Sequence, residues 1–377
     1  MTITPTNAQK KTDLLALTLP QLQQWLVERG EAPFRAKQLY SWLYQHLATD
    51  FPAMTNLPLT LRQQLADEAS IGPMVVRSEL RSKDDRTRKI LLELADGKLI
   101  ESVLMLYPPH GESSARATVC VSTQAGCAFG CTFCATGQMG FDRHLSAGEI
   151  VAQALYFARE LRAAPWTAAG LPGSAPIDHI TNIVLMGMGE PLHNYGNVLL
   201  ALRILNSADG FNLGARHMTV STVGLVPAIR KLSQEPLQVN LAISLHAPTD
   251  ALRNQTMPIN RKYPLQELLA ACKDYIAATK RQVTFEYVLL AGVNDTPEHA
   301  RLLGELLAPL KQFAHVNCIP VNATSASYQA PGPEAIRAFR NILFEHGVSN
   351  SVRAERGDDI AAACGQLRTR YEQNRQQ

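Results

Sequence analysis

Hydrophobic positions at the start of the chain follow a helical spacing. Between Asp13 and about Ala69, apolar residues recur every three or four positions in two runs: Leu19, Leu22, Trp25, Leu26, and then Ala36, Leu39, Tyr40, Leu43. This spacing places apolar side chains on one face of a helix. Gly30 and Pro33 separate the runs, because both residue types interrupt helices. We therefore expect a small helical domain over residues 1–72.

The pattern changes to strands after this region. Three runs rich in β-branched and other apolar residues are expected to be strands: Met74–Leu80, Arg88–Ala95 and Lys98–Tyr107. The dipeptide Asp96-Gly97 is typical of a two-residue hairpin turn between the last two runs. Residues 73–112 are therefore expected to form an antiparallel strand segment that links the helical domain to the rest of the chain.

Strand and helix patterns alternate six times after Ala117. The β-rich runs are Val119–Ser122, Ile180–Met186, His217–Thr222, Val239–Leu245, Val283–Leu289 and Val316–Val321. The first intervening helix starts with the capping-box pair Ser146 and Glu149, and the last long helix follows Pro333 and runs to Gly347. This alternation predicts an α/β core over residues 113–350 with a parallel sheet covered by helices, either a partial (β/α) barrel or a doubly wound sheet.

Two further stretches lie outside this alternation. Ala163–Pro176 is rich in Ala, Gly and Pro and is expected to be a surface insertion. Residues 351–377 form a C-terminal segment, which is polar beyond Arg370 and is expected to fray.

Composition narrows the class of protein. A chain of 377 residues with 46% hydrophobic and 18% charged residues can bury one large core with a smaller domain beside it. Met1–Lys11 is polar, and no apolar run approaches the roughly 20 residues of a membrane span, so we expect a cytoplasmic protein with no membrane contact. The net charge of +3 permits an RNA partner without requiring one. Seven cysteines outside a secretory context favour reduced thiols with chemical roles.

Three of these cysteines are clustered between the first β-rich run and the first capped helix. Cys127, Cys131 and Cys134 lie within eight residues, next to Gly126 and Gly130. Structural zinc sites usually need four ligands arranged in two pairs, and no second pair follows here. Three thiolates therefore suit an iron-sulfur cluster with one open iron better than zinc.

This CxxxCxxC loop resembles the loop of the radical SAM superfamily. The resemblance implies a [4Fe-4S] cluster held by Cys127, Cys131 and Cys134, whose remaining iron binds S-adenosylmethionine (SAM), and it implies reductive cleavage of SAM to a 5′-deoxyadenosyl radical. It also implies a partial (β/α)6 TIM-like barrel, which decides between the two folds that the alternation left open.

Polar residues at the carboxyl ends of several strands predict a ligand pocket, because ligands bind at that edge of α/β folds. A glycine-rich turn, Gly187 to Pro191, follows the strand that ends at Met186, and a simple tight turn is the alternative interpretation. The superfamily resemblance implies that Gly189 and Glu190 contact the SAM amino group. Three further strand ends carry polar residues and complete the expected SAM pocket, with Leu245 included as the middle residue of Ser-Leu-His: Ser221, Ser244, Leu245, His246 and Asn322. His246 could alternatively be a general base.

Two more cysteines acquire a role only from a closer resemblance. Cys364 lies among small residues in RGDDIAAACGQL, and Cys120 lies on the first β-rich run, so each alone could be a packed core residue. Together with the cysteine loop, Gly-Met-Gly-Glu-Pro and Ser-Leu-His-Ala-Pro, the Cys364 segment is similar to the RlmN family over nearly the whole chain. That resemblance implies methylation of carbon 2 of an adenine in 23S ribosomal RNA (rRNA), and in transfer RNA (tRNA) next to the anticodon.

The implied chemistry gives both cysteines a task. Carbon 2 of adenine is a poor nucleophile, so an electrophilic methyl group cannot simply be transferred to it. The resemblance implies that Cys364 first accepts a methyl group from one SAM, and that a second SAM supplies the radical which activates this S-methylcysteine. Cys120 then resolves the protein-RNA thioether by forming a transient disulfide with Cys364. Glu101 would accept the carbon 2 proton, although its sequence context alone favours a solvated strand carboxylate.

Other expectations concern partners. Basic residues crowd the antiparallel segment, where a phosphate-binding patch and a mixed solvated face are equally compatible with the sequence: Arg77, Arg81, Lys83, Arg86, Arg88 and Lys89. RNA would be held by the N-terminal domain, with its target base unstacked. The superfamily implies an electron donor such as flavodoxin, and we expect a monomer.

Three alternatives remain open from the residues. The related Cfr type uses the same two cysteines and methylates carbon 8 of adenine. A zinc-stabilised RNA-binding protein without catalysis would leave Cys120 and Cys364 unexplained. A radical SAM enzyme with another substrate, such as a glycyl-radical activase, would give Cys364 no task.

Overall fold

The N-terminal region is helical, as its apolar spacing predicts. A computed structural model describes residues 11–109, 111, 114–167, 175–321, 328–353 and 368. Its first helices are α1 (Leu19–Val27), α2 (Arg35–Tyr44) and α3 (Leu59–Glu68). Thr18 and Gln21 form a capping box at the start of α1, so two of the otherwise unpaired groups at this helix end are satisfied. A short parallel pair, β1 (Thr12–Asp13) with β2 (Ala69–Ser70), closes the region.

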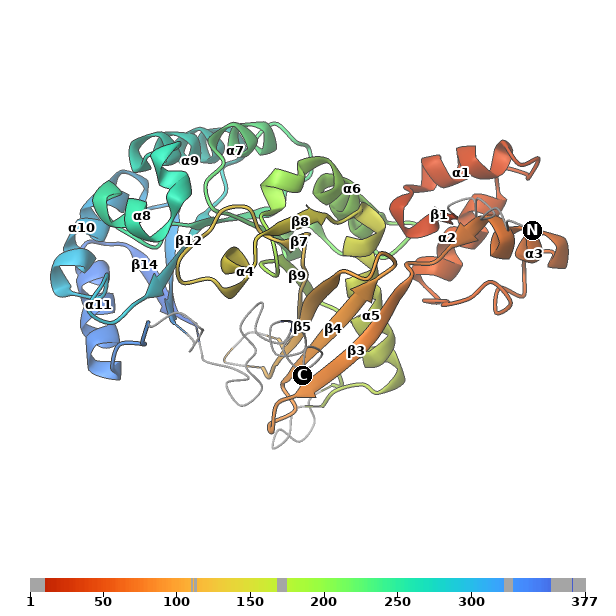
Figure 1. Ribbon diagram of the computed structural model, residues 1–377, viewed down its shortest axis with the longest axis horizontal. Helices are drawn as coiled ribbons and strands as arrows, with labels where there is room; N and C mark the ends of the chain where they lie inside the picture. The colour runs from red at the N-terminus through yellow and green to blue at the C-terminus, as the bar shows by residue number, and fades with distance from the viewer. Residues whose placement is uncertain are drawn as a thin grey trace, which may run out of the picture.

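One sheet of ten strands organises the rest of the described chain (Figure 1). The strand order is β14-β13-β12-β11-β10-β9-β6-β5-β4-β3. The bounds are β3 (Met74–Arg81), β4 (Thr87–Leu94), β5 (Leu99–Tyr107), β6 (Arg116–Cys120), β9 (Asn182–Leu185), β10 (Met218–Thr222), β11 (Asn240–Ser244), β12 (Val283–Leu289), β13 (Ala314–Pro320) and β14 (Ser349–Val352). The strands from β6 to β14 pair in parallel, and β3 to β5 are antiparallel.

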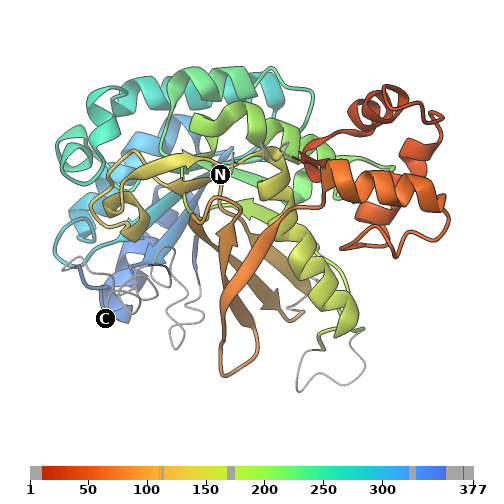
Figure 2. The same ribbon diagram turned by 45° about the vertical axis from the view of Figure 1, so that its right-hand side comes forward.

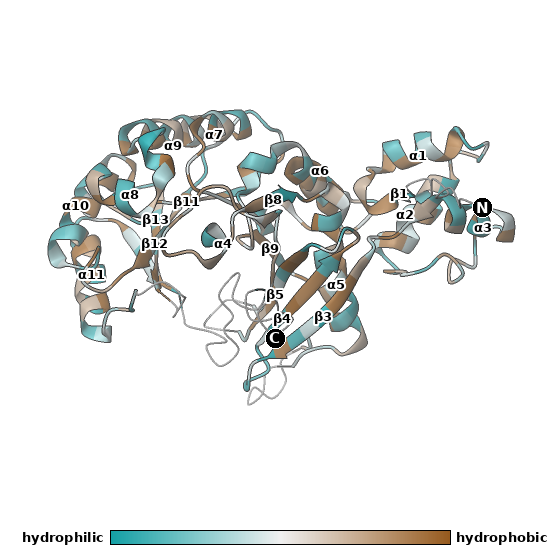
Figure 3. Ribbon diagram, viewed as in Figure 1, coloured by the Kyte–Doolittle hydropathy of each residue, from teal (hydrophilic) through white to brown (hydrophobic). Residues whose placement is uncertain are grey.

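Helices cover the outer face of the parallel strands, as expected for a partial barrel (Figure 2). They are α5 (Ala147–Ala163), α6 (Tyr195–Asn206), α7 (Val226–Leu232), α8 (Asp250–Thr256), α9 (Leu265–Thr279), α10 (Pro297–Leu307) and α11 (Pro333–Glu345), with short 3-10 turns η1 (Leu14–Ala16), η2 (Pro191–Asn194), η3 (Ala215–His217), η4 (Pro258–Arg261) and η5 (Ala308–Leu310). Strands β4 and β5 are mostly hydrophobic, whereas α8 consists mostly of polar residues (Figure 3). The fold is thus the α/β barrel type that the resemblance implies, and no helix among the described residues is long and apolar enough to cross a membrane.

Three features of the fold were not expected. The antiparallel strands are continuous with the barrel sheet, because β5 pairs with β6 over Val103–Tyr107. A seventh parallel strand, β14, adds to β13, although its sequence is short and polar. A small hairpin, β7 (Gln124–Gly126) with β8 (Phe141–His144), encloses the short helix α4 (Ala135–Gln138) and the cysteine loop.

The N-terminal helices and the barrel share one hydrophobic core. On the barrel side, Arg159 of α5 donates from Nε to the carbonyl oxygen of Leu47 at 2.8 Å. Gln45 at the end of α2 donates to the carbonyl oxygen of Asp209 at 3.3 Å. The helical region is therefore held against the α5 and α6 side of the barrel (Figure 2).

Candidate active site

The cysteine loop is shaped by its glycines. Gly126 has φ +79°, and a Cβ added there would lie 2.1 Å from the carbonyl oxygen of Gly140, so the two ends of the loop approach too closely for any side chain. The Cys127 amide donates to the same Gly140 oxygen at 2.7 Å. Cys134 N donates to Cys131 O at 3.1 Å. These contacts hold the three cysteines on one compact turn.

The three thiols influence one another electrostatically. Burial raises the pKa of Cys127 to about 11, and the Cys134 and Glu190 charges add to this increase. Burial also raises the pKa of Cys131, and the charges of Cys134 and Cys127 raise it further. A bound cation would reverse this penalty, because metal-bound thiols are deprotonated.

The donor set fits an iron-sulfur cluster in its chemistry. Cys127, Cys131 and Cys134 are free thiols, and the loop carries no fourth cysteine. Within the described ranges, no group of three or more His, Cys, Asp or Glu side chains is arranged to hold a single metal ion. The three cysteines would be the protein ligands of a [4Fe-4S] cluster, which is bound by cysteine thiolates.

The turn after β9 faces the cysteine loop. Gly189 has φ +100°, and an added Cβ would lie 2.5 Å from the Cβ of Gln124, so only glycine fits there. Glu190 is 2% exposed, and its carboxylate accepts the amides of Leu192 at 3.0 Å and Val223 at 2.8 Å. Burial raises the pKa of Glu190 to about 7, although these amides and the Thr222 hydroxyl partly oppose the increase. The carboxylate therefore joins the ends of β9 and β10.

Gln124 connects the glycine turn to the hairpin beside the cysteine loop. Its Oε1 accepts the Glu190 amide at 2.8 Å. Its Nε2 lies 3.0 Å from Nδ1 of His144 and 3.2 Å from Nδ1 of His193. Gln124 is fully buried, and the sequence interpretation did not identify it. Its only sequence signal is a glutamine three positions before the first cysteine of the loop.

Several of the predicted site residues lie at the carboxyl ends of neighbouring parallel strands. Ser221 and Ser244 are partly exposed at the carboxyl ends of β10 and β11. Leu245 is fully buried in the hydrophobic core, so a ligand could meet only its backbone.

The His246 backbone is strained, with φ +57°. Its Nδ1 accepts the Val288 amide at 3.0 Å, and its ring packs edge-on against Phe133 of the cysteine loop, with centroids 4.8 Å apart. Burial lowers the pKa of His246 to about 3, with the Arg253 charge contributing. A side chain this weakly basic, with Nδ1 already occupied, is poorly suited to the general-base role.

Arg253 on α8 is the residue that ties these strand ends together. Its guanidinium is fully buried and donates to three main-chain carbonyl oxygens: Leu245 at 3.0 Å, Val223 at 2.7 Å and Ser244 at 3.1 Å. It also donates to Oδ1 of Asn260 at 2.8 Å. Its charge opposes the rise in the pKa of Cys131. The sequence offered no signal for it, because an arginine on a short helix is usually solvated.

A second group of site residues lies on β4, β5 and β6. Cys120 ends β6, and its carbonyl oxygen accepts the Ser102 hydroxyl of β5 at 2.8 Å. Glu101 is 2% exposed, and Lys89 pairs with its Oε2 at 2.9 Å while being completely buried itself. The interpretation of Glu101 as a solvated strand carboxylate is therefore wrong, because β5 is an interior strand with β4 and β6 on either side.

Arg368 contacts this second group. The amide of Arg368 donates to Oε1 of Glu101 at 2.7 Å. Burial raises the pKa of the Cys120 thiol, and the negative charge of Glu101 raises it further. The positive charges of Arg353 and Lys89 act in the opposite direction and favour the thiolate. Asn322 and Cys364 lie outside the described residues.

The basic residues of the antiparallel segment do not form a patch of uncompensated charge. Nearby acids pair with most of them: Arg77 with Glu93, Arg81 with Glu79, Arg86 with Asp84, Arg88 with Asp85, and Lys89 with Glu101. The mixed face is the better interpretation.

Comparison with known proteins identifies the family. Residues 12–71 match the family described as "Ribosomal RNA large subunit methyltransferase N-terminal domain", and residues 175–303 match "Radical SAM superfamily". A Roseiflexus castenholzii protein named "Probable dual-specificity RNA methyltransferase RlmN" is 46% identical, with 97% of this chain and 98% of the relative covered. A Geobacillus kaustophilus protein of the same name is 48% identical, covering 95% of this chain and 92% of the relative.

A solved structure agrees with these matches. The crystal structure of a radical SAM methyltransferase from Sphaerobacter thermophilus has a TM-score of 0.87 and 48% identity, and covers 94% of this chain and 98% of that one. With relatives this similar over nearly its full length, the chain belongs to the RlmN family of radical SAM RNA methyltransferases.

Proposed function

We propose that this chain methylates carbon 2 of an adenine in 23S rRNA, and in tRNA next to the anticodon, through an S-methylcysteine at Cys364. The observation that supports it most is the bond from the Arg368 amide to Glu101. Arg368 follows Cys364 by four residues in the sequence, and Glu101 lies on β5, which pairs with the strand that ends at Cys120. This short spacing supports the proposal that a methyl-carrying thiol at Cys364, the base Glu101 and the second thiol Cys120 act together.

Separate parts of the chain would divide the work. We propose that residues 1–72 hold RNA, that the antiparallel strands of 73–112 supply Glu101, and that 113–350 bind the cofactors. Residues 351–377 would bring Cys364 to them. The N-terminal match to a ribosomal RNA methyltransferase domain supports the first assignment.

The cofactors would sit at the carboxyl ends of the barrel strands. Cys127, Cys131 and Cys134 would hold a [4Fe-4S] cluster, and the SAM pocket would include Gly189, Glu190, Ser221, Ser244, Leu245, His246 and Asn322. When bound, the cluster and two SAM molecules per turnover supply a methyl group and the radical that activates it. A small electron donor such as flavodoxin would reduce the cluster, and the enzyme would act as a monomer.

The chain's own groups then act in order. Cys364 accepts the methyl group at sulfur, and one hydrogen atom of this group would pass to the radical that the cofactors supply. The resulting carbon radical adds to carbon 2 of adenine, the adduct gives up one electron, which the cofactors would take back, and Glu101 takes the proton from carbon 2. Neutralising Glu101 removes the charge that disfavours the Cys120 thiolate, while Lys89 and Arg353 continue to favour it. Cys120 attacks the sulfur of Cys364, the thioether carbon leaves and takes up a proton, and a disulfide remains that an external thiol must reduce.

The test is nucleoside mass spectrometry on unmodified rRNA and tRNA, treated with anaerobically reconstituted protein, SAM and a reductant. We expect 2-methyladenosine, and its loss in Cys364→Ala and Cys120→Ala. Cys272→Ala, which removes a buried thiol of helix α9, is the matched control and should retain activity. An 8-methyladenosine product would instead assign the Cfr type. SAM cleavage without any methylated adenosine would refute the proposal.

A further inference from the structure

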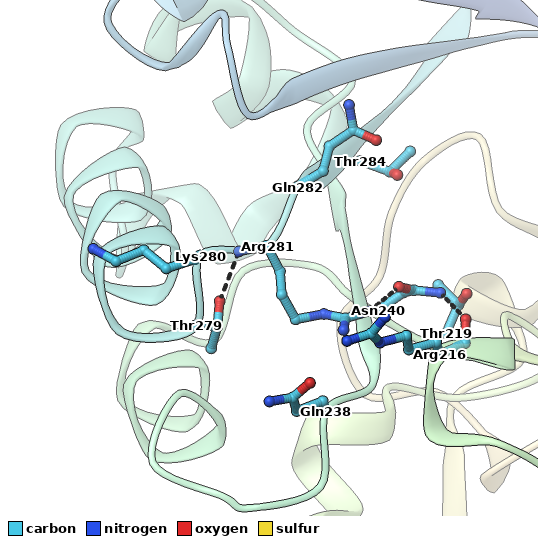
Figure 4. Close-up of a pocket in the computed structure, with 9 residues that line it drawn as sticks. All are labelled: Arg216, Thr219, Gln238, Asn240, Thr279, Lys280, Arg281, Gln282 and Thr284. Atoms are coloured by element: carbon cyan, nitrogen blue, oxygen red, sulfur yellow. Dashed lines mark hydrogen bonds between the residues drawn. The ribbon is translucent and has the colours of Figure 1, made fainter.

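A polar pocket lies at the end of the barrel opposite the candidate active site. It has a volume of about 700 Å³ and is lined by residues from η3, the start of β11, the end of α9 and the start of β12 (Figure 4). Thr219 and Asn240, at the amino ends of β10 and β11, are paired in register. The active-site residues of the same strands, Ser221 and Ser244, lie at their carboxyl ends. The two sites are therefore separated by the length of the strands.

The lining carries positive charge without a matching acid. Arg216, Lys280 and Arg281 line the pocket, and none of its nine lining residues is acidic. None of the ion pairs between described residues involves these three cations. Lys280 follows the last turn of α9, where it offsets the partial negative charge of the helix end, and its side chain points away from the arginines (Figure 4). Of the three cations, Arg216 and Arg281 are therefore the two whose positive charge is available to bind a ligand in the pocket.

Both arginines are held at Asn240. The Asn240 side chain donates from Nδ2 to the carbonyl oxygen of Arg216 at 2.7 Å, and its Oδ1 accepts a bond from the Arg281 guanidinium. The Nε of Arg281 is buried beside Tyr275, so a ligand cannot reach it. The exposed Arg216 side chain and the outer part of the Arg281 guanidinium are the donors that an anion in the pocket can meet. Two guanidinium groups on one pocket wall also repel each other unless an anion lies between them.

We propose that this pocket binds the phosphate of a nucleotide. Arginine forks match phosphate oxygens, and Gln238 and Gln282 add side-chain amides, which can hydrogen-bond to base edges or ribose. The volume falls within the range of pockets that hold small ligands. The nucleotide could be free or part of an RNA strand, because the phosphate chemistry is the same. This site does not depend on methyl transfer, because it lies at the other end of the strands.

Isothermal titration calorimetry on the full-length, cluster-loaded protein tests this inference. The probes are uridine 5′-monophosphate and a short oligouridylate, because neither contains the adenine that the active site would accept. We expect saturable binding of one of them with Kd below about 1 mM. Arg216→Gln and Arg281→Gln should each weaken binding about ten-fold, and Arg216→Lys less, because lysine keeps the charge and loses the fork. Lys273→Gln, which removes an exposed lysine of α9 outside the pocket, should leave binding unchanged.

The outcomes separate the sources and the alternative. Binding of the mononucleotide that depends on the arginines assigns a free nucleotide, whereas binding of only the oligonucleotide assigns an RNA strand. Should Arg281→Gln fail to fold, Arg216→Gln carries the test, because the Arg216 side chain is exposed. The inference is overturned if neither probe binds saturably, if uridine without phosphate competes equally, or if the arginine variants bind as the parent does.

Discussion

Replacing Arg253 with methionine should destabilise the fold and disturb the SAM pocket together. The change keeps an apolar stem of similar length and removes the donors of a completely buried guanidinium. Four acceptors then lose a bond: the carbonyl oxygens of Leu245, Val223 and Ser244, and Oδ1 of Asn260. Each lost bond to the charged guanidinium costs about 1 kcal/mol, although the Leu245 oxygen still accepts the Ala247 amide at 2.8 Å, and removal of the costly buried charge returns part of the sum. We expect a net loss of about 3 kcal/mol.

Urea unfolding of the apo protein measures this loss. The matched control is Arg230→Met, which removes an arginine of α7 that is 53% exposed and has a single surface ion pair with Asp274. Such pairs contribute up to about 1 kcal/mol, so the control should change stability little. If Arg253→Met and Arg230→Met lose equal stability, Arg253 does not hold the strand ends together.

A second readout separates this positioning role from general stability. Arg253 favours the ionised thiol of Cys131, so its loss removes positive charge beside the cysteine loop. In the reconstituted protein, the cluster reduction potential should become more negative in Arg253→Met and stay unchanged in Arg230→Met. An unchanged potential in Arg253→Met would refute the electrostatic part of this reasoning.

Three further predictions concern the same site. Because the pKa of Glu190 is raised from 4.5 to about 7, the unfolding free energy of the apo chain should fall by on the order of 3 kcal/mol as pH rises between those values. Denaturation curves of Glu190→Gln should lack this pH dependence. The same pH dependence in Glu190→Gln and the parent would contradict the prediction. Lys89→Met should cost about 3 to 5 kcal/mol, because it removes the buried ion pair between Lys89 and Glu101. Lys98→Met, which breaks a surface pair with Asp142, should cost under about 1 kcal/mol in the same assay. Gly189→Ala should weaken SAM binding in equilibrium dialysis, because the added Cβ has no space at φ +100°. The control Gly196→Ala, on α6, places its Cβ in open space and should bind SAM as the parent does.

Elements with strong local signals were predictable. The Asp96-Gly97 turn joins β4 and β5 as expected, and Ser146 caps α5 with Glu149. The run Val283–Leu289 is a strand over its full predicted length. These signals act within a few residues, through turn conformation, side-chain capping and the alternation of buried and open faces.

Elements that depend on distant partners were not predictable. Strand β14 is short and polar, and it forms only because β13 offers a free edge. Hairpin β7–β8 depends on a close approach of Gly126 to Gly140, which no local pattern reveals. The basic residues of β3 and β4 looked like a candidate phosphate patch until the fold paired them with acids.

The sequence alone determined the kinds of chemistry available to this protein: three clustered thiols, a glycine turn after a strand, and polar residues at strand ends. These follow from residue type and local spacing, which determine which ligands and turns are possible. Only the tertiary structure decided burial and charge pairing. It placed Lys89 against Glu101 and set Arg253 beneath the ends of β10 and β11. Burial depends on what packs from other parts of the chain, and it is burial that gives these charges their strength.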